Sequence, residues 1–241
     1  MIRPPSIKVV EETGSTNADL VSALGSGEML NEGDWLVAKR QTAGKGRQGR
    51  EWFDGSGNFM GSCVVSLQSG DPPPASLSFV AAMAVYDAAA RVLPNTSKLR
   101  LKWPNDVMLD GGKLSGILLE LVGQSIVTGI GVNLAKAPVL PDRKTSALCD
   151  LAGPVEPTSF AETLAASFAH WLGQWREQGL NALLSRFLER SIHASGSSVT
   201  VHDTDGTYIT GTFAGLEESD GALRLRLADG SERVIRAGDI A

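Results

Sequence analysis

Apolar residues in the first half of the chain follow the two-residue repeat of strands more often than the repeat of helices. Short apolar runs bounded by glycine, proline, asparagine or aspartate are typical of strands, because a half-buried strand alternates its faces. The predicted strands cover residues 35–40, 58–68, 98–103, 107–110, 111–123 and 125–134. The pattern therefore indicates a sheet built between residues 35 and 134.

Helical spacing appears before, within and after these strands. Thr16, followed by Asp19 three positions later, has the form of a capping box at the start of a helix. Residues 76–93 are rich in alanine and apolar on most faces, as in a helix buried against a sheet. The expected helices run over residues 16–25, 76–93 and 157–175, with a short partner over 180–190.

After Ser191 the pattern changes to regular alternation with hairpin turns. Asp-Gly pairs recur at residues 205–206, 220–221 and 229–230, and such pairs are common in two-residue hairpin loops. A small β-barrel of about fifty residues suits this spacing. We expect two domains, one over residues 1–190 of the α+β class and one over residues 191–241.

Composition narrows the class of protein without naming a function. Apolar residues make up 42% of the 241-residue chain, and 22 basic residues stand against 27 acidic ones. The acidic balance argues against a broad nucleic-acid-binding face. The two cysteines, Cys63 and Cys149, lie in apolar surroundings without metal-ligand spacing, which favours free thiols. With no signal peptide or membrane span in the pattern, we expect a cytoplasmic protein with no membrane partner.

A glycine-rich stretch between the first two predicted strands concentrates positive charge. The sequence GKGRQGR over residues 44–50 alternates glycines with Lys45, Arg47 and Arg50. Backbone amides bared by glycine, together with cations, form a good site for an anion. A solvated hairpin turn uses the same glycines, so the loop alone leaves both interpretations open.

A polar turn lies between the predicted strands at residues 98–103 and 107–110. The sequence WPND ends at Asp106, and Lys113 follows a Gly-Gly turn at the start of an apolar strand. Taken singly, Asn105 and Asp106 also suit an Asx turn, and Lys113 also suits a charge that protects a strand edge.

Five motifs, however, occur together and in one order. They are GSTN (14–17), GKGRQGREW (44–52), KWPND (102–106), GGKLSGILLE (111–120) and GIGVNL (129–134). Together they resemble the biotin protein ligases, of the type without an N-terminal DNA-binding domain. The resemblance covers residues 11–134 and implies a mixed, largely antiparallel sheet packed with helices, like that of class II aminoacyl-tRNA synthetases. A small SH3-like β-barrel would follow.

The resemblance also implies site residues. The catalytic set would be Lys113, Arg47 and Asp106. The biotin-binding set would be Ser15, Thr16, Asn17, Gln41, Gly44, Lys45, Gly46, Arg47, Lys113 and Gly116. The ATP-binding set would be Arg47, Arg50, Trp52, Asn105, Lys113 and Asn133. Capping a helix is by itself the commoner role for Ser15 and Thr16, and Trp52 is equally suited to core packing. Metal ligands stay unassigned.

The implied reaction joins biotin and ATP into biotinyl-5'-AMP and then passes the biotinyl group to a lysine. ATP and Mg²⁺ would be required, and the partner would be the biotin carboxyl carrier domain of acetyl-CoA carboxylase and related carboxylases. No DNA binding is expected, and the chain is compatible with a monomer or a homodimer. Two alternatives remain: a lipoate protein ligase, and a binding module without turnover.

Overall fold

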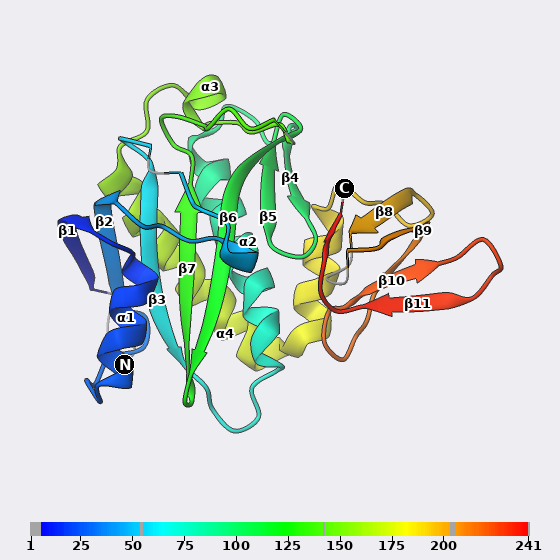
Figure 1. Ribbon diagram of the computed structural model, residues 1–241, viewed down its shortest axis with the longest axis horizontal. Helices are drawn as coiled ribbons and strands as arrows, with labels where there is room; N and C mark the ends of the chain where they lie inside the picture. The colour runs from blue at the N-terminus through cyan, green and yellow to red at the C-terminus, as the bar shows by residue number, and fades with distance from the viewer. Residues whose placement is uncertain (1–5, 54, 142, 203–205, 241) are drawn as a thin grey trace.

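The computed structural model describes residues 6–53, 55–141, 143–202 and 206–240, which form two sheets and their covering helices (Figure 1). The larger sheet has seven strands in the order β1-β2-β3-β7-β6-β5-β4. Its β1–β2 pair is parallel and its other pairs are antiparallel. The strands are β1 (Ile7–Thr13), β2 (Trp35–Gln41), β3 (Phe59–Ser66), β4 (Leu99–Lys102), β5 (Asp106–Leu109), β6 (Gly112–Val122) and β7 (Ser125–Val132).

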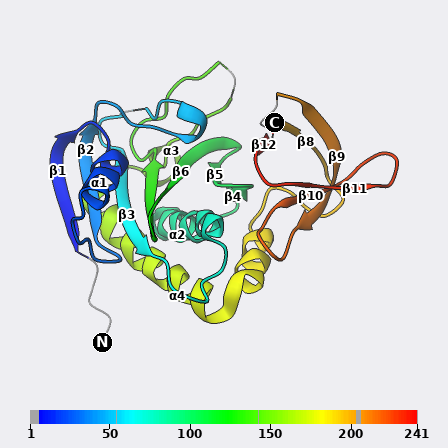
Figure 2. The ribbon, with the colours of Figure 1, turned by 60° about the horizontal axis from the view of Figure 1, so that its bottom comes forward.

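Helices cover both faces of this sheet unequally. Helices α2 (Leu77–Val92) and α4 (Pro157–Glu189) cover one face, and α1 (Thr16–Gly25) lies on the other (Figures 1 and 2). A short α3 (Cys149–Ala152) and two 3-10 turns, at Arg47–Gly49 and Pro74–Ser76, complete the helical elements. Helix α4 is interrupted at Gly179, whose φ of 78° is not helical. The face opposite α2 and α4 is therefore left for a site.

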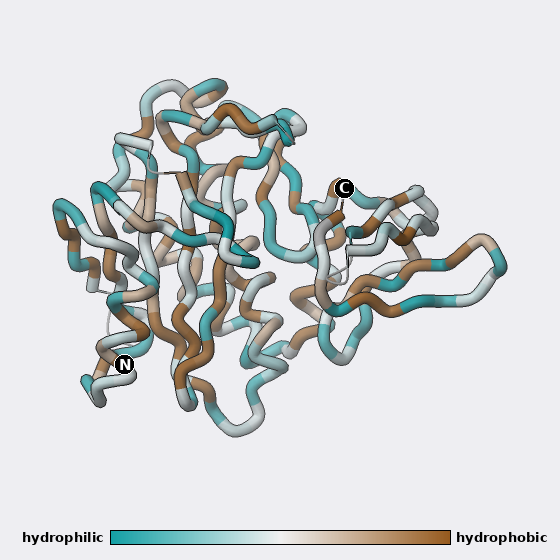
Figure 3. Tube along the Cα trace, in the orientation of Figure 1, coloured by the Kyte–Doolittle hydropathy of each residue, from teal (hydrophilic) through white to brown (hydrophobic). Residues whose placement is uncertain are grey.

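The core lies between the sheet and the pair α2–α4. Five alanines of α2 are fully buried, and their small side chains let the neighbouring helix and the sheet approach closely. Trp175 is fully buried and its indole N–H donates to the Ser76 hydroxyl at 2.8 Å. The hydropathy colours of Figure 3 show apolar residues along the central strands. The stretch Pro74–Val92 is long and apolar enough to cross a membrane, but 61% of its most apolar window is buried inside the protein, as in a core helix.

Two local details differ from the sequence-based expectations. Strand β1 was not predicted, because its apolar positions are few and half of its length is exposed. The capping box was predicted to start at Thr16, with Ser15 also considered as a cap; the cap is Ser15, whose hydroxyl accepts from the Ala18 amide at 3.4 Å. Asp19, the expected second member of the capping box, instead accepts from the Thr13 hydroxyl. The Thr16 hydroxyl does not cap the helix and is therefore available for contacts with other residues.

The smaller sheet is antiparallel and has the order β11-β10-β9-β8-β12. Its strands are β8 (Ser198–His202), β9 (Tyr208–Leu216), β10 (Leu223–Arg226), β11 (Glu232–Ile235) and β12 (Asp239–Ile240). Strand pairing among the described residues does not close it into a ring. Turns at residues 220–221 and 229–230 connect its strands as predicted, while the turn expected at 205–206 includes a residue outside the described part.

The smaller sheet is packed against the larger unit through the turn at Gly221. The Trp103 indole N–H donates to the Gly221 carbonyl at 3.0 Å, and the Phe79 ring lies against the Gly221 Cα. The contact is buried and continuous with the main core. The turn between β9 and β10 is thereby held near the corner between β4 and β5.

Candidate functional site

The floor of the candidate site is a patch of glycines in the two central strands. Gly116 of β6 and Gly131 of β7 are direct neighbours across the strands. The Trp52 ring lies against both, so that a methyl group at either position would overlap the indole. Asn17, from α1, lies in the same way against Gly129. Without Cβ atoms, the strands can be approached this closely by side chains or by a ligand.

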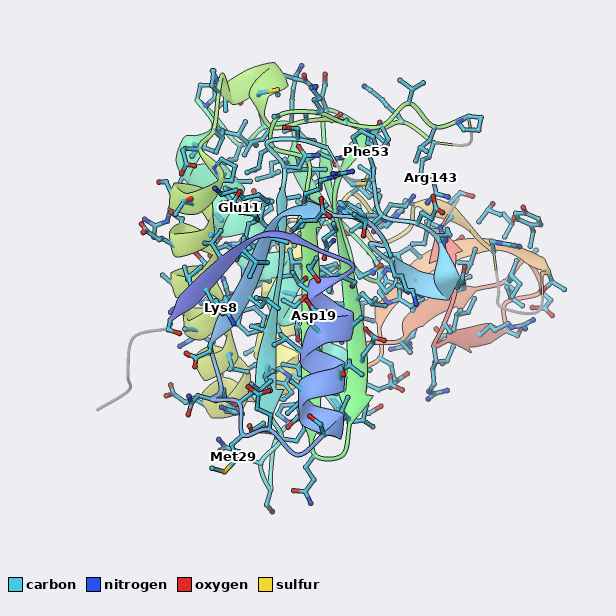
Figure 4. The ribbon with its side chains drawn as sticks, turned by 60° about the vertical axis from the view of Figure 1, so that its left-hand side comes forward. Lys8, Glu11, Asp19, Met29, Phe53 and Arg143 are labelled. Atoms are coloured by element: carbon cyan, nitrogen blue, oxygen red, sulfur yellow. The ribbon has the colours of Figure 1, made fainter. Side chains whose placement is uncertain are left out.

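The glycine-rich loop forms a small hairpin over this face. The Trp52 amide donates to the Gly44 carbonyl at 2.9 Å, and the Gly46 amide donates to the Arg50 carbonyl at 2.7 Å. Lys45 at its outer edge is exposed. Figure 4 shows the face that carries α1, with Asp19 labelled on that helix and Phe53 after the loop.

Arg47 connects this loop to two other parts of the chain. Its Nη1 donates to Asn105 Oδ1 at 3.0 Å, and its Nη2 donates to the Gly238 carbonyl of the smaller sheet's last turn at 3.3 Å. Asn105 is buried and its Nδ2 donates to the Ile117 carbonyl at 2.7 Å. The loop, the WPND corner, β6 and the C-terminal end therefore meet at one guanidinium.

Lys113 lies at the start of β6, beside the same corner. Its Nζ is 2.6 Å from Asp106 Oδ1, and the two side chains are only 22% and 20% exposed. A partly desolvated ion pair holds its members in place more firmly than a surface pair does. The Lys113 stem lies against the glycine patch, since its Cε would be 3.6 Å from a Cβ built at Gly116.

A chain of buried polar groups lies on the other side of the patch. Gln41 Oε1 accepts from the Thr16 amide at 2.7 Å and lies 3.0 Å from the Thr16 hydroxyl. The Thr16 hydroxyl is 2.7 Å from the Ser62 hydroxyl, and Ser62 donates to Asn17 Oδ1 at 2.6 Å. Asn17 Nδ2 then donates to Glu120 Oε2 at 2.6 Å. Four elements far apart in sequence contribute to this chain.

Asn133 links the site to the loop that follows β7. It is buried, and its Nδ2 lies 3.3 Å from both the Lys113 carbonyl and the Ser146 carbonyl. Its Oδ1 is buried without a hydrogen-bond partner among the described residues. An unused buried acceptor of this kind can accept from a ligand N–H.

A basic hollow, lined among others by Lys136, Arg143 and Lys144, lies in the loop after Asn133. The Lys113 amide donates to the Lys144 carbonyl at 2.9 Å, so this loop runs beside β6. Sequence reasoning missed these cations, although three of them within the ten residues after the GVNL motif were a visible signal. Figure 4 labels Arg143 near the top of the view, close to Phe53 in projection.

The structure gathers most of the predicted site residues around the glycine patch. Lys113, Asp106, Asn105 and Arg47 form one group, and Thr16, Asn17 and Gln41 form another. Ser15 caps α1 at the edge of the second group. The side chain of Arg50 donates to Gln48 at 2.8 Å, within the loop itself. Ser62, Glu120, Gly129 and Gly131 were not predicted, because their roles depend on which strands become neighbours.

Neither a cluster of metal ligands nor an ionised thiol is found among the described residues. Among the described residues, no group of three or more histidine, cysteine, aspartate or glutamate side chains is arranged to hold a metal ion. Burial raises the pKa of the Cys63 thiol well above its usual value, and burial also raises the pKa of Cys149. Both thiols therefore stay protonated at neutral pH.

The fold and site define an α+β protein with Lys113 and Arg47 gathered on the open face of its main sheet. The chain belongs to the Biotin/lipoate A/B protein ligase family, whose model matches residues 11–136. The model of the biotin protein ligase C terminal domain matches residues 194–241. The family resemblance of the motifs is thereby confirmed.

Curated relatives and solved structures agree with this assignment. A biotin--[acetyl-CoA-carboxylase] ligase from Paracoccus denitrificans is 38% identical over 96% of this chain and 98% of its own length. One from Mycobacterium tuberculosis is 35% identical over 97% of this chain and 88% of its own. The structure of a biotin protein ligase from Aquifex aeolicus in complex with biotin and ATP superposes with a TM-score of 0.83, at 23% identity, covering 98% of this chain and 97% of that one. The last likeness confirms the fold.

Proposed function

We propose that this chain is a biotin protein ligase. In the first step a biotin carboxylate oxygen attacks the α-phosphorus of ATP, the bond to the bridging oxygen breaks, and pyrophosphate leaves. In the second step a lysine amine attacks the acyl carbon of biotinyl-5'-AMP, AMP leaves, and one proton is released. The observation that carries the proposal is the Lys113–Asp106 pair beside Arg47, at the edge of a glycine-floored face.

The cations suit the charge changes of the first step. Negative charge builds on the α-phosphate as it passes through five-coordination, and a nearby fixed cation stabilises that charge. Lys113 supplies a compact ammonium, and Asp106 positions it at 2.6 Å. We assign the catalytic role to Lys113 and the positioning role to Asp106.

The loop suits the second requirement, which is to keep water from the acyl adenylate. Arg47 fastens the loop to Asn105 and to the Gly238 carbonyl, so the hairpin is held over the site. A closed loop protects a reactive intermediate from hydrolysis. This arrangement supports Arg47 as the residue that retains the adenylate, with Gly44, Lys45 and Gly46 around the ligand.

The other predicted contacts stay part of this proposal. Thr16, Asn17 and Gln41 would take the ureido ring, with Ser15 at the helix start and Gly116 as floor. Arg50, Trp52, Asn105 and Asn133 would take ATP, the last through its unused Oδ1. The basic hollow around Lys136, Arg143 and Lys144 adds positive charge on the same side.

Mg²⁺ would enter with the triphosphate. Magnesium keeps several waters and is usually held by one or two carboxylates together with substrate phosphates. Asp106 is a carboxylate in the right place for such a contact, and the described residues offer no larger acidic cluster. The ion would neutralise phosphate charge.

The carrier domain of acetyl-CoA carboxylase is the proposed partner, in keeping with the names of the Paracoccus and Mycobacterium relatives. A cytoplasmic location and a domain boundary at residues 190/191 complete the proposal.

Pyrophosphate release from ATP and magnesium, with biotin or lipoate at equal concentration, tests the function directly. Release with biotin and not with lipoate is the expected result. Release with lipoate instead would move the chain to the lipoate branch. Binding of biotin without any release would leave only a binding module.

A further inference from the structure

We propose that Asn58 is a positioning residue that holds the basic segment after β7 in place for the phosphate groups of ATP. The basic segment is the stretch over residues 135–141 and 143–145, which carries Lys136, Arg143 and Lys144 around the hollow. The inference rests on the proposed function and extends it to a residue outside the predicted site.

Asn58 lies between the glycine-rich loop and strand β3, and it is only 3% exposed. Its backbone amide donates to the Gly55 carbonyl at 2.9 Å, which closes a turn just before Phe59, the first residue of β3. A Cβ at Gly55 would lie 2.3 Å from Asn58 Nδ2. The glycine therefore leaves the room that the buried Asn58 side chain occupies.

The polar contacts of the Asn58 side chain all go to the start of the basic segment. Its Oδ1 accepts from the Ala135 amide at 3.0 Å and from the Lys136 amide at 3.1 Å. Its Nδ2 donates to the Lys136 carbonyl at 2.7 Å. Backbone amides only donate and a carbonyl only accepts, so the Asn58 amide fits in one orientation.

The same turn supports the segment by packing. Gly57 has a φ of 85°, and a Cβ built there would lie 3.0 Å from the Ala135 Cβ. Three hydrogen bonds and this close approach thus fix where the segment leaves the sheet.

The other end of the basic segment is tied to the catalytic lysine. The Lys113 amide donates to the Lys144 carbonyl at 2.9 Å, and the Ser146 amide donates to the Lys113 carbonyl at 3.1 Å. The hollow between Lys136 and Lys144 is therefore held at one end by Asn58 and at the other by the backbone of Lys113.

This arrangement suits the polyphosphate part of the substrate. Negative charge moves onto the pyrophosphate as its bond to the α-phosphorus breaks, and cations fixed nearby stabilise that charge. Cations on a loosely held segment would lose conformational entropy when the phosphates bind. Asn58 removes part of that cost by ordering the segment beforehand, without touching ATP itself.

The test measures formation of biotinyl-5'-AMP from ATP and magnesium in the wild type, Asn58→Ala and Asn58→Asp. An aspartate keeps an oxygen for the Ala135 and Lys136 amides and loses only the Nδ2 donor, so it guards against a general loss of the fold. The control is Ser76→Ala, which removes an equally buried hydroxyl that accepts from the Trp175 indole under the opposite face of the sheet.

We expect the ATP KM of Asn58→Ala to rise about tenfold, the scale of one to two lost hydrogen bonds. Asn58→Asp should show a smaller rise. Biotin affinity, measured by calorimetric titration, should stay at the wild-type value in both. Ser76→Ala should lose stability in thermal unfolding but keep the wild-type ATP KM.

Two further measurements identify the route of the effect. Inorganic tripolyphosphate carries the charge of the ATP tail without the nucleoside, and its inhibition of the reaction should weaken in Asn58→Ala by the same factor. In a protein with both Lys136→Met and Arg143→Met, Asn58→Ala should raise the ATP KM little further, because the cations that it positions are gone.

An unchanged ATP KM in Asn58→Ala, or equal losses of ATP and biotin affinity, would overturn the inference and leave Asn58 as a structural support of the loop. Unaltered inhibition by tripolyphosphate would remove the phosphates from the role. Absence of biotin-dependent turnover in the wild type would instead overturn the proposed function, so the failures are distinguishable.

Discussion

Arg47 Nη1 donates to Asn105 Oδ1 at 3.0 Å and thereby joins the glycine-rich loop to the corner between β4 and β5. Asn105 passes the restraint on to β6, where its Nδ2 donates to the Ile117 carbonyl at 2.7 Å. The loop is thus fastened to the strand that also carries Lys113. The Asn105 side chain therefore connects the glycine-rich loop, which covers the site, to strand β6 beneath it.

Removal of the Arg47 side chain should open this cover. Arg47→Ala loses both the Asn105 and the Gly238 contacts, so biotinyl-5'-AMP should still form but escape into solution. The measurement is biotinylation of a bystander protein such as albumin, which should rise several-fold. Arg40→Ala, which deletes an exposed arginine on β2, is the matched control and should leave bystander labelling low. A bystander signal equal in both variants would remove Arg47 from the retaining role.

Loss of the Lys113 ammonium should slow the first step most. Lys113→Ala removes the fixed cation and leaves the Asp106 carboxylate partly buried without that partner. A fall of about 10²-fold in pyrophosphate release is expected, as for other lost electrostatic contacts to a transition state. Lys98→Ala breaks an exposed pair with Asp110 next to the ends of β4 and β5 and serves as control. Near-normal release in Lys113→Ala would exclude the assigned role.

A single methyl group on the glycine floor should disturb the site. Gly131→Ala places its Cβ 2.2 Å from the nearest atom of the Trp52 ring, and the ring must move away from β7. We expect weaker biotin binding and a loss of stability of about 1–3 kcal/mol, the usual cost of overpacking. Calorimetric titration and thermal unfolding would measure the two effects. Gly173→Ala, on α4 with open space around it, should show neither.

Stability should fall as the pH falls below neutrality, because of His193. Burial, with a smaller effect of Lys102, lowers the pKa of His193 from 6.5 to about 4. The unfolded chain therefore binds more protons than the folded chain between these pH values. The contribution of the neutral ring is complete above about pH 6.5 and is lost progressively as the pH falls toward 4.

Urea unfolding at pH 7 and pH 5 would measure this loss for the wild type and for His193→Gln. The variant should show a smaller difference between the two pH values, since its side chain does not titrate. His170→Gln, which leaves His193 in place, should keep the wild-type difference. An equal pH response in all three proteins would contradict the account.

Apart from β1, the order of the main helices and strands was accessible from the sequence, because local side-chain pattern and turn residues determine where each one lies. The two-residue repeat of β2, β3, β6 and β7 and the alanine-rich surface of α2 identify these elements at their own positions. Glycine, proline and aspartate mark the turns between them. The five motifs likewise identified the family, and with it Lys113, Asp106, Arg47 and Asn105 as members of one site.

Tertiary structure alone decided how distant groups meet. Glu120 and Ser62 lie 58 residues apart in the sequence, on β6 and β3. Their connection through Asn17 forms only because α1 lies across β3, β7 and β6 in the folded protein. The same holds for Trp52 on Gly131, for the ion pair of Lys113 with Asp106, and for the edge strand β1. Periodicity reports the face on which a side chain lies, but partner choice depends on register and packing between strands, and these are properties of the whole fold.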